Sequence, residues 1–214
     1  MLLATLARPA WADGKWQRLG QEDGILLEIR EIPGQDFPEL RGTTVMPVNS
    51  WQVLSVIADL NRTCLWTARC AESKELSRTS EFDRLFYSRT SAPFPVSHRD
   101  GVLHGMFVGD LAQGTDMAIK FDSVASPLMP ARDGVVRMTT LRGHYRIWAI
   151  DEHSSRVEFV VHADPMGWLP TWLVRRMATG VPRDTLAGLR KQAVKMIGKY
   201  DDQIQRWRGQ AGAN

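Results

Sequence analysis

The chain has 214 residues, of which 43% are hydrophobic and 24% are charged, and its formal net charge is +3 at pH 7. This length and composition are those of an ordinary globular protein and favour one large domain over two. The mild charge argues against nucleic acid as a partner, because phosphate binding needs a concentrated basic surface.

Residues 1–14 are expected to be a lead-in rather than part of the domain. The segment is apolar and ends in Ala10-Trp11-Ala12, a small-x-small pattern suited to signal peptidase, but it lacks the basic start of a complete secretion signal. Two interpretations remain open: the remnant of a secretion signal, or an alanine-rich lead-in. The first predicts a periplasmic or secreted protein and the second a cytoplasmic one. Without about 18 uninterrupted apolar residues, no transmembrane helix is expected.

Alternating apolar and polar residues, separated by turn residues, predict nine strands. A helix is expected after the third strand, where Asn49 or Ser50 can cap the first turn and apolar residues follow at helical spacing. The predicted strands cover residues 17–20, 25–32, 40–47, 72–79, 84–90, 101–109, 116–123, 135–150 and 156–163.

The chain has two cysteines, Cys64 and Cys70, which lie six residues apart. Their surroundings do not favour a zinc site, which needs four ligands, or a nucleophile, which needs a nearby histidine or helix N-terminus. Two buried free thiols or one short disulfide remain as alternatives. A disulfide would indicate an oxidising compartment such as the periplasm.

The C-terminal segment is expected to be a long amphipathic helix with an interruption. Apolar residues return to one helical face from Leu186 to Trp207, over about six turns at 3.6 residues per turn. Residues 180–182 read Gly-Val-Pro, so we expect a kink or hinge there, or a static break between two helices. Lys191, Lys195 and Lys199 share another face, which is either a solvated back or a contact for an anionic membrane.

So long an apolar face needs a large concave partner, and the preceding strands are the candidate. Periodicity alone therefore indicates an α+β protein with an antiparallel sheet. A final helix laid across a curved sheet is an architecture that can enclose a pocket of lipid size.

Five motifs occur in a fixed order along the chain. They are PFPVSHRD at residues 93–100, GVVR at 134–137, GHYRIW at 143–148, DPMGWLPTW at 164–172 and LAGLR at 186–190. This series resembles the START domain, the lipid-transfer module related to the steroidogenic acute regulatory protein, over roughly residues 15–208. No single motif is decisive, but their order is specific to the family.

The resemblance implies an α+β helix-grip fold, in which a curved antiparallel sheet wraps around a long C-terminal helix and encloses a hydrophobic cavity. It implies a single START-like domain at residues 15–209 and a short tail at 210–214. The implied function is non-catalytic binding, and transfer, of a lipid or other hydrophobic small molecule, gated by the C-terminal helix and adjoining loops. The resemblance also implies a monomer that makes transient contact with a membrane surface. It implies no cofactor and no metal. An aromatase/cyclase-like enzyme of the same superfamily and a ligand-sensing module are the alternatives.

Arg99 and Asp100 belong to the first motif and are expected to have structural roles. Adjacent strand residues face opposite sides, so the two are not expected to pair with each other. Arg99 would brace loop 92–97 or meet a carboxylate elsewhere, and Asp100 would cap backbone donors. Some sterol-binding members carry a buried arginine six residues after this one. Here that place is Gly105, so specificity for a sterol hydroxyl is not implied.

Strand alternation and the apolar face of the last helix predict the residues that line the cavity. An error of one residue in any strand would exchange its whole set for the opposite face. The expected ligand-binding residues are Phe94, Met106, Phe121, Met138, Trp148, Phe159, Trp168, Trp172, Leu189 and Ala193.

Overall fold

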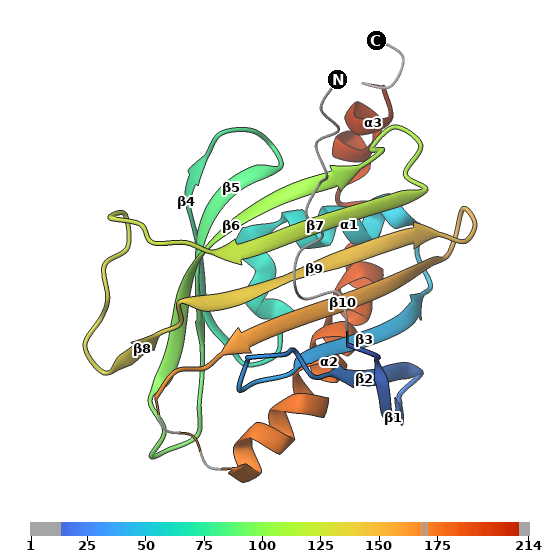
Figure 1. The fold of residues 1–214 in the computed structure, drawn as a ribbon. Helices are drawn as coiled ribbons and strands as arrows, with labels where there is room; N and C mark the ends of the chain where they lie inside the picture. Colours follow the sequence, from blue (N-terminus) through green and yellow to red (C-terminus); the bar gives the residue numbers. More distant parts are fainter. Residues whose placement is uncertain (1–13, 168, 170, 210–214) are drawn as a thin grey trace, which may run out of the picture.

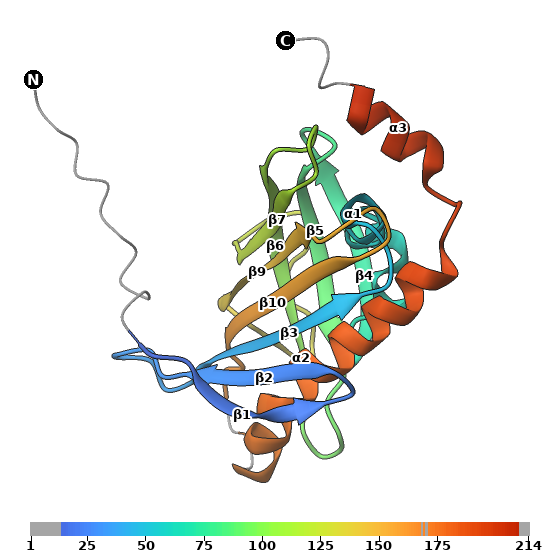
Figure 2. The ribbon, with the colours of Figure 1, turned by 90° about the vertical axis from the view of Figure 1, so that its right-hand side faces the viewer.

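The computed structural model describes residues 14–167, 169 and 171–209. Its main feature is a curved, ten-stranded sheet with helices packed on one face (Figures 1 and 2). The possible signal remnant and Trp168 lie outside the described residues. The strands are β1 (Gln17–Glu22), β2 (Ile25–Arg30), β3 (Glu39–Met46), β4 (Cys70–Arg78), β5 (Asp83–Thr90), β6 (His98–Gly109), β7 (Asp116–Ser123), β8 (Val135–Arg137), β9 (Thr140–Ala149) and β10 (Ser155–Asp164).

The strand order is β1-β2-β3-β10-β9-β7-β6-β5-β4, and neighbours along this path are antiparallel. The short strand β8 lies off the path and pairs with β6 in parallel. Figure 2 shows the helices on the same side of the curved sheet. The α+β class and the curved antiparallel sheet with a long C-terminal helix are therefore confirmed. The helices are α1 (Ser50–Ala58), the 3-10 helix η1 (Leu60–Leu65), α2 (Thr171–Lys195) and α3 (Asp201–Gly209).

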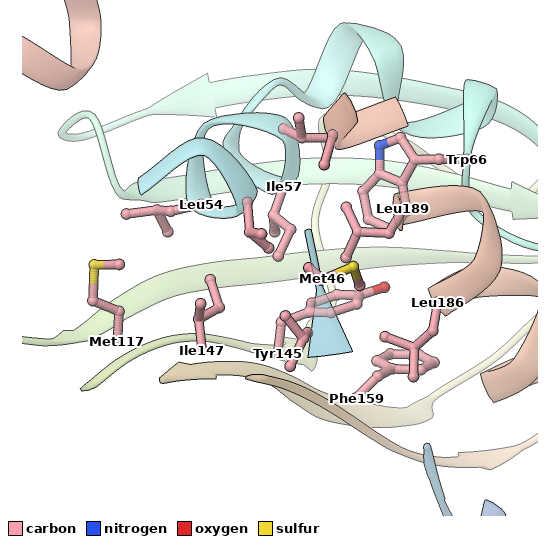
Figure 3. Packing of buried hydrophobic residues seen from close by; sticks show 14 of the residues in the cluster. Met46, Leu54, Ile57, Trp66, Met117, Tyr145, Ile147, Phe159, Leu186 and Leu189 are labelled. Carbon is pink, nitrogen blue, oxygen red and sulfur yellow. The ribbon is translucent and has the colours of Figure 1, made fainter. Parts of the chain in front are cut away.

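Helix α1 begins where the sequence predicts it. The side chain of Asn49 accepts a hydrogen bond of 2.9 Å from the backbone N–H of Gln52, which satisfies one of the free donors of the first turn. Apolar residues of α1 then pack into the core together with α2 and the inner face of the sheet (Figure 3). The core thus joins the inserted helix, the final helix and the sheet into one hydrophobic layer.

The single strand expected at residues 135–150 is two strands. Strand β8 pairs with β6, and the chain then turns so that β9 can pair with β7 and β10. At the turn the backbone N–H of Met138 donates to the carbonyl oxygen of Asp100 at 2.8 Å. This change of partner breaks the alternation that a continuous strand would have between residues 138 and 141.

Of the two alternatives at Gly180-Val181-Pro182, the static break between two helices is wrong, because α2 continues through Pro182 as one helix of 25 residues, and a kink or hinge there stays a prediction. A proline in a helix removes one backbone hydrogen bond, but Pro182 is buried against β3. A Cβ built on Gly42 of β3 would lie 3.0 Å from the Pro182 Cβ. The apolar face is instead interrupted after Lys195, around Gly198, whose φ of 80° favours glycine.

Helix α2 also rests on the turn that follows η1. A Cβ built on Gly188 would lie 2.2 Å from the carbonyl oxygen of Trp66, so the two backbones touch there. The backbone N–H of Ala68 donates to Thr185 Oγ1 at 3.2 Å. This turn lies between Cys64 and Cys70. The disulfide that joins the two cysteines therefore constrains the segment on which α2 packs.

Candidate functional site

A cavity of about 280 Å³ lies between the inner face of the sheet and α2. Its wall is built from alternate residues of β3, β5, β6, β7, β9 and β10, from α2, and from segments next to η1. Most of these side chains are apolar or aromatic, as in sites for hydrophobic small molecules, which occupy roughly 300–1,000 Å³. The confirmed architecture therefore encloses the kind of space that the sequence predicts.

Three of the expected residues lie in this wall: Phe121 on β7, Met138 after β8, and Phe159 on β10. Phe121 and Phe159 are both buried and belong to the hydrophobic core. Tyr145 of β9 connects them, since its ring stacks on Phe159 with centroids 4.5 Å apart and contacts Phe121 at 6.1 Å.

Met106 and Trp148 lie on the opposite face of the sheet, which corrects their expected place in the cavity wall. On β6, Leu103 and Gly105 line the cavity, so the even-numbered Met106 points away and is 40% exposed. On β9 the lining residues are odd-numbered, and the ring of Trp148 instead contacts the guanidinium of Arg146 at 4.8 Å. Met138 and Trp148 are both even-numbered, but only Met138 lines the cavity. The separation of β8 from β9 explains this difference, because the two residues do not belong to one continuous strand.

Four other expected residues also depart from the wall. Phe94 is 98% exposed at the tip of the β5–β6 loop, although its neighbours Ala92 and Pro93 do line the cavity. Trp172 is 56% exposed on the first turn of α2. Leu189 and Ala193 are fully buried in the core beyond the cavity, toward α1. The carbonyl of Ala193 accepts a hydrogen bond from the Gln52 side chain there.

Several lining residues were not expected from the sequence. Correct alternation on β9 and β10 would have indicated some of them, and the helical spacing of 173, 177 and 181 would have indicated others. Those near η1 carry no sequence signal, because only the folded turn brings them to the cavity. The lining residues that were not expected include Trp66, Leu103, Leu141, Tyr145, Val161, Leu173, Met177, Val181 and Thr185.

Arg99 and Asp100 face opposite sides of β6 and make separate sets of bonds. Arg99, at the cavity side, donates to the carbonyl oxygens of Ser97 at 2.6 Å and of Pro165 and Met166 at 3.1 Å. It thereby joins the β5–β6 loop to the turn after β10. Burial lowers the pKa of the Arg99 guanidinium.

Asp100 is fully buried on the outer side of β6. It accepts hydrogen bonds from Arg137 Nε at 2.7 Å and from the Tyr87 hydroxyl at 3.0 Å. These side-chain donors replace the backbone donors expected from the sequence. Burial, and then the hydrogen bond to Asp100, raise the pKa of Tyr87 to about 12. Arg137 also donates to the carbonyl of Met129, so the cluster fixes the loop between β7 and β8.

Cys64 and Cys70 form a disulfide, which decides between the two alternatives left open by the sequence. The bridge closes the turn whose residues Trp66, Thr67 and Ala68 lie at the cavity wall. Trp66 and Ala68 of this turn both line the cavity and contact α2, so the turn connects the cavity wall to the helix.

Within the described ranges, no helix has the length and hydropathy needed to cross a membrane. The same residues contain no group of three or more His, Cys, Asp and Glu side chains placed to hold a metal ion.

The comparisons with known proteins agree on one family. A model of the START domain matches residues 4–192. The chain is 28% identical over 180 residues to uncharacterized protein PA1579 of Pseudomonas aeruginosa, covering 84% of this chain and 87% of that protein. It is 26% identical over 182 residues to the phosphatidylcholine transfer protein of Mus musculus, covering 84% of each. A STAR-related lipid transfer protein from Xanthomonas axonopodis superposes with a TM-score of 0.72 at 29% identity, covering 83% of this chain and 98% of that one.

Proposed function

Because the chain belongs to the START domain family, we propose that it binds one lipid or similar hydrophobic molecule in its cavity and carries it between membranes as a monomer. The observation that carries the proposal is the apolar cavity enclosed between the sheet and α2. Binding would be non-covalent. Each Å² of apolar ligand surface removed from water contributes about 25 cal/mol.

The charged groups in the cavity wall support binding rather than chemistry, because they have structural partners. Arg84 donates to the carbonyl oxygens of Ala58 at 2.7 Å and Glu81 at 2.5 Å. Arg99 holds three carbonyl oxygens, and the carboxylate of Glu81 accepts a hydrogen bond from Gln203 at 3.1 Å. Each of these groups would have to leave a partner before it could act on a ligand.

We propose that the end of the molecule bearing the β5–β6 loop and the start of α2 meets the membrane. Both segments, with the turn after β10, lie together at one end of the sheet (Figure 1). The described residues of these segments include three large apolar side chains that are exposed: Phe94 at 98%, Trp172 at 56% and Met166 at 37%. Aromatic side chains of this kind favour the interface between water and lipid. The same segments also contribute Pro93, Pro165 and Leu173 to the cavity wall, so a ligand could pass directly between membrane and cavity.

A matched pair of variants on α2 tests the proposal. Met177 lines the cavity, whereas its neighbour Arg176 is exposed. Met177→Trp would place a large ring in the cavity, and Arg176→Trp would add the same ring outside. We expect the first to reduce binding of N-phenyl-1-naphthylamine and the second to leave this binding near the wild-type level. Equal binding by the two folded variants would contradict a ligand site in this cavity.

The Cys64–Cys70 disulfide supports the further proposal that the protein works in an oxidising compartment, the periplasm or the exterior. Intact mass of alkylated protein from its native source, with and without reduction, tests this. Two alkylated thiols in the unreduced sample would contradict it.

A further inference from the structure

Tyr145 presents a hydroxyl group to the cavity. It belongs to β9, lines the cavity and is only 7% exposed. Its ring is fixed on two sides: it stacks on Phe159 and meets the Trp66 ring edge-on, with centroids 5.7 Å apart (Figure 3). The ring therefore has little freedom to turn its hydroxyl toward another part of the wall.

The Tyr145 hydroxyl has no hydrogen-bond partner among the residues that the structure describes. Burial alone raises its pKa, so the group keeps its proton and remains a neutral donor. Buried hydroxyl groups in proteins nearly always have partners, because an unpaired one loses its bonds to water without compensation. The unused donor in the cavity wall is thus a feature that a bound molecule would explain.

Further unpaired polar atoms lie on η1 and on the turn after it, whose Trp66 contacts Tyr145. In the described part of the chain, Thr63 Oγ1, Trp66 Nε1 and Thr67 Oγ1 are buried without a hydrogen-bond partner. All three residues line the cavity. Thr185 of α2 joins them, because its Oγ1 accepts from Ala68 of the same turn. The three unpaired atoms have almost no surface open to the cavity, so the Tyr145 hydroxyl is more accessible to a ligand than they are.

The positive groups of the wall are engaged elsewhere, which favours a neutral partner for the Tyr145 hydroxyl. Arg69 Nε donates to the carbonyl of Ser91 at 3.0 Å, and Arg84 and Arg99 hold the carbonyl oxygens described above. A carboxylate or phosphate placed beside Tyr145 would lose its hydration and gain only neutral donors, an unfavourable exchange for a charge.

We propose that the Tyr145 hydroxyl forms a hydrogen-bonding subsite for a neutral hydroxyl or carbonyl group of the ligand. The inference rests on the proposed function and deepens it. The cavity of about 280 Å³ lies at the small end of the roughly 300–1,000 Å³ range of small-molecule sites, which suits one slender chain. The preferred ligand class is therefore a single-chain lipid with a neutral polar end.

The test compares ligands that share a chain and differ in the polar end. Nonan-1-ol, 1-chlorononane and nonanoate are titrated at pH 8 against protein loaded with N-phenyl-1-naphthylamine, in the wild type and in Tyr145→Phe. This substitution keeps the ring and removes only the hydroxyl. We expect it to weaken nonan-1-ol roughly three- to tenfold, the size of one neutral hydrogen bond, and 1-chlorononane less than twofold. Nonanoate should bind more weakly than nonan-1-ol to the wild type.

Two further variants support the comparison. Tyr200→Phe removes a hydroxyl bonded to Asp59 at 2.9 Å outside the cavity wall, and should change neither ligand's affinity. Thr67→Val removes a polar atom that has almost no surface open to the cavity, and should not weaken the alcohol selectively. Equal effects of Tyr145→Phe on alcohol and chloride, or nonanoate binding as tightly as the alcohol, would overturn the subsite and leave the carrier function standing. Failure of the wild type to bind the naphthylamine or any of the three ligands would overturn both.

Discussion

Two glycines of α2 provide a direct test of how the helix is held over the cavity. Glycine is about 1 kcal/mol worse than alanine in a helix interior, so a neutral exchange to alanine stabilises. At Gly180 the added Cβ would meet only Asp184 Oδ2, at 3.9 Å. We therefore expect Gly180→Ala to raise the free energy of unfolding by about 0.5–1 kcal/mol.

At Gly188 the same exchange should have the opposite sign. The added Cβ would lie 2.2 Å from the Trp66 carbonyl oxygen, where ordinary C···O contacts are about 3.3 Å, so α2 must move off the turn by about 1 Å. Overpacking of this kind costs about 1–3 kcal/mol, and the disulfide limits how far the turn can yield. Because the clash is with backbone atoms, the cost lies at the upper end of this range, and after a gain of about 1 kcal/mol in helix propensity we expect a net loss of about 2 kcal/mol.

Urea unfolding followed by tryptophan fluorescence measures both variants. A difference of about 3 kcal/mol separates their midpoints by roughly 1 M at an m-value of about 2–3 kcal/mol/M. If α2 covers the cavity, Gly188→Ala should also release N-phenyl-1-naphthylamine faster than Gly180→Ala does. Gly188→Ala protein as stable as Gly180→Ala would refute the contact between α2 and the turn.

Four other outcomes are expected. Replacing Cys64 and Cys70 by serine should lower the free energy of unfolding by about 2 kcal/mol, since a loop this short constrains the unfolded chain little, and urea midpoints measure it. Asp100→Ala should cost about 3 kcal/mol in the same assay, because it leaves buried donors unpaired; a loss below 1 kcal/mol would contradict that role. From pH 10 to 12 the unfolded form of Tyr87 ionises before the folded form, so stability falls, and Tyr87→Phe should flatten this decline in unfolding titrations. Phe94→Ser should slow vesicle transfer several-fold without changing naphthylamine affinity, and unchanged transfer would place the membrane contact elsewhere.

Local patterns predicted those elements whose structure depends on local chemistry. The strand at residues 116–123 and the capped start of α1 match the sequence prediction, because alternation and an asparagine cap act over a few residues. The order of strands came from the family resemblance, since pairing between distant segments leaves no local pattern.

The errors share a physical cause, which is tertiary contact overriding local preference. Pro182 ends no helix, because burial against Gly42 outweighs one lost hydrogen bond. Met138 and Trp148 differ in face because β8 pairs with β6 before β9 begins. Tyr145 was missed for the same reason, although its alternation with Leu141 on β9 would have indicated an inward side chain.

Native mass spectrometry of the purified protein tests most directly that the cavity holds a lipid. We expect wild-type protein from its own host to carry one hydrophobic molecule per chain, which organic extraction releases and identifies. The Arg176→Trp variant should retain this molecule and the Met177→Trp variant should lose it. Wild-type protein that carries no such molecule, and takes none up from vesicles, would contradict a lipid-binding function for the cavity.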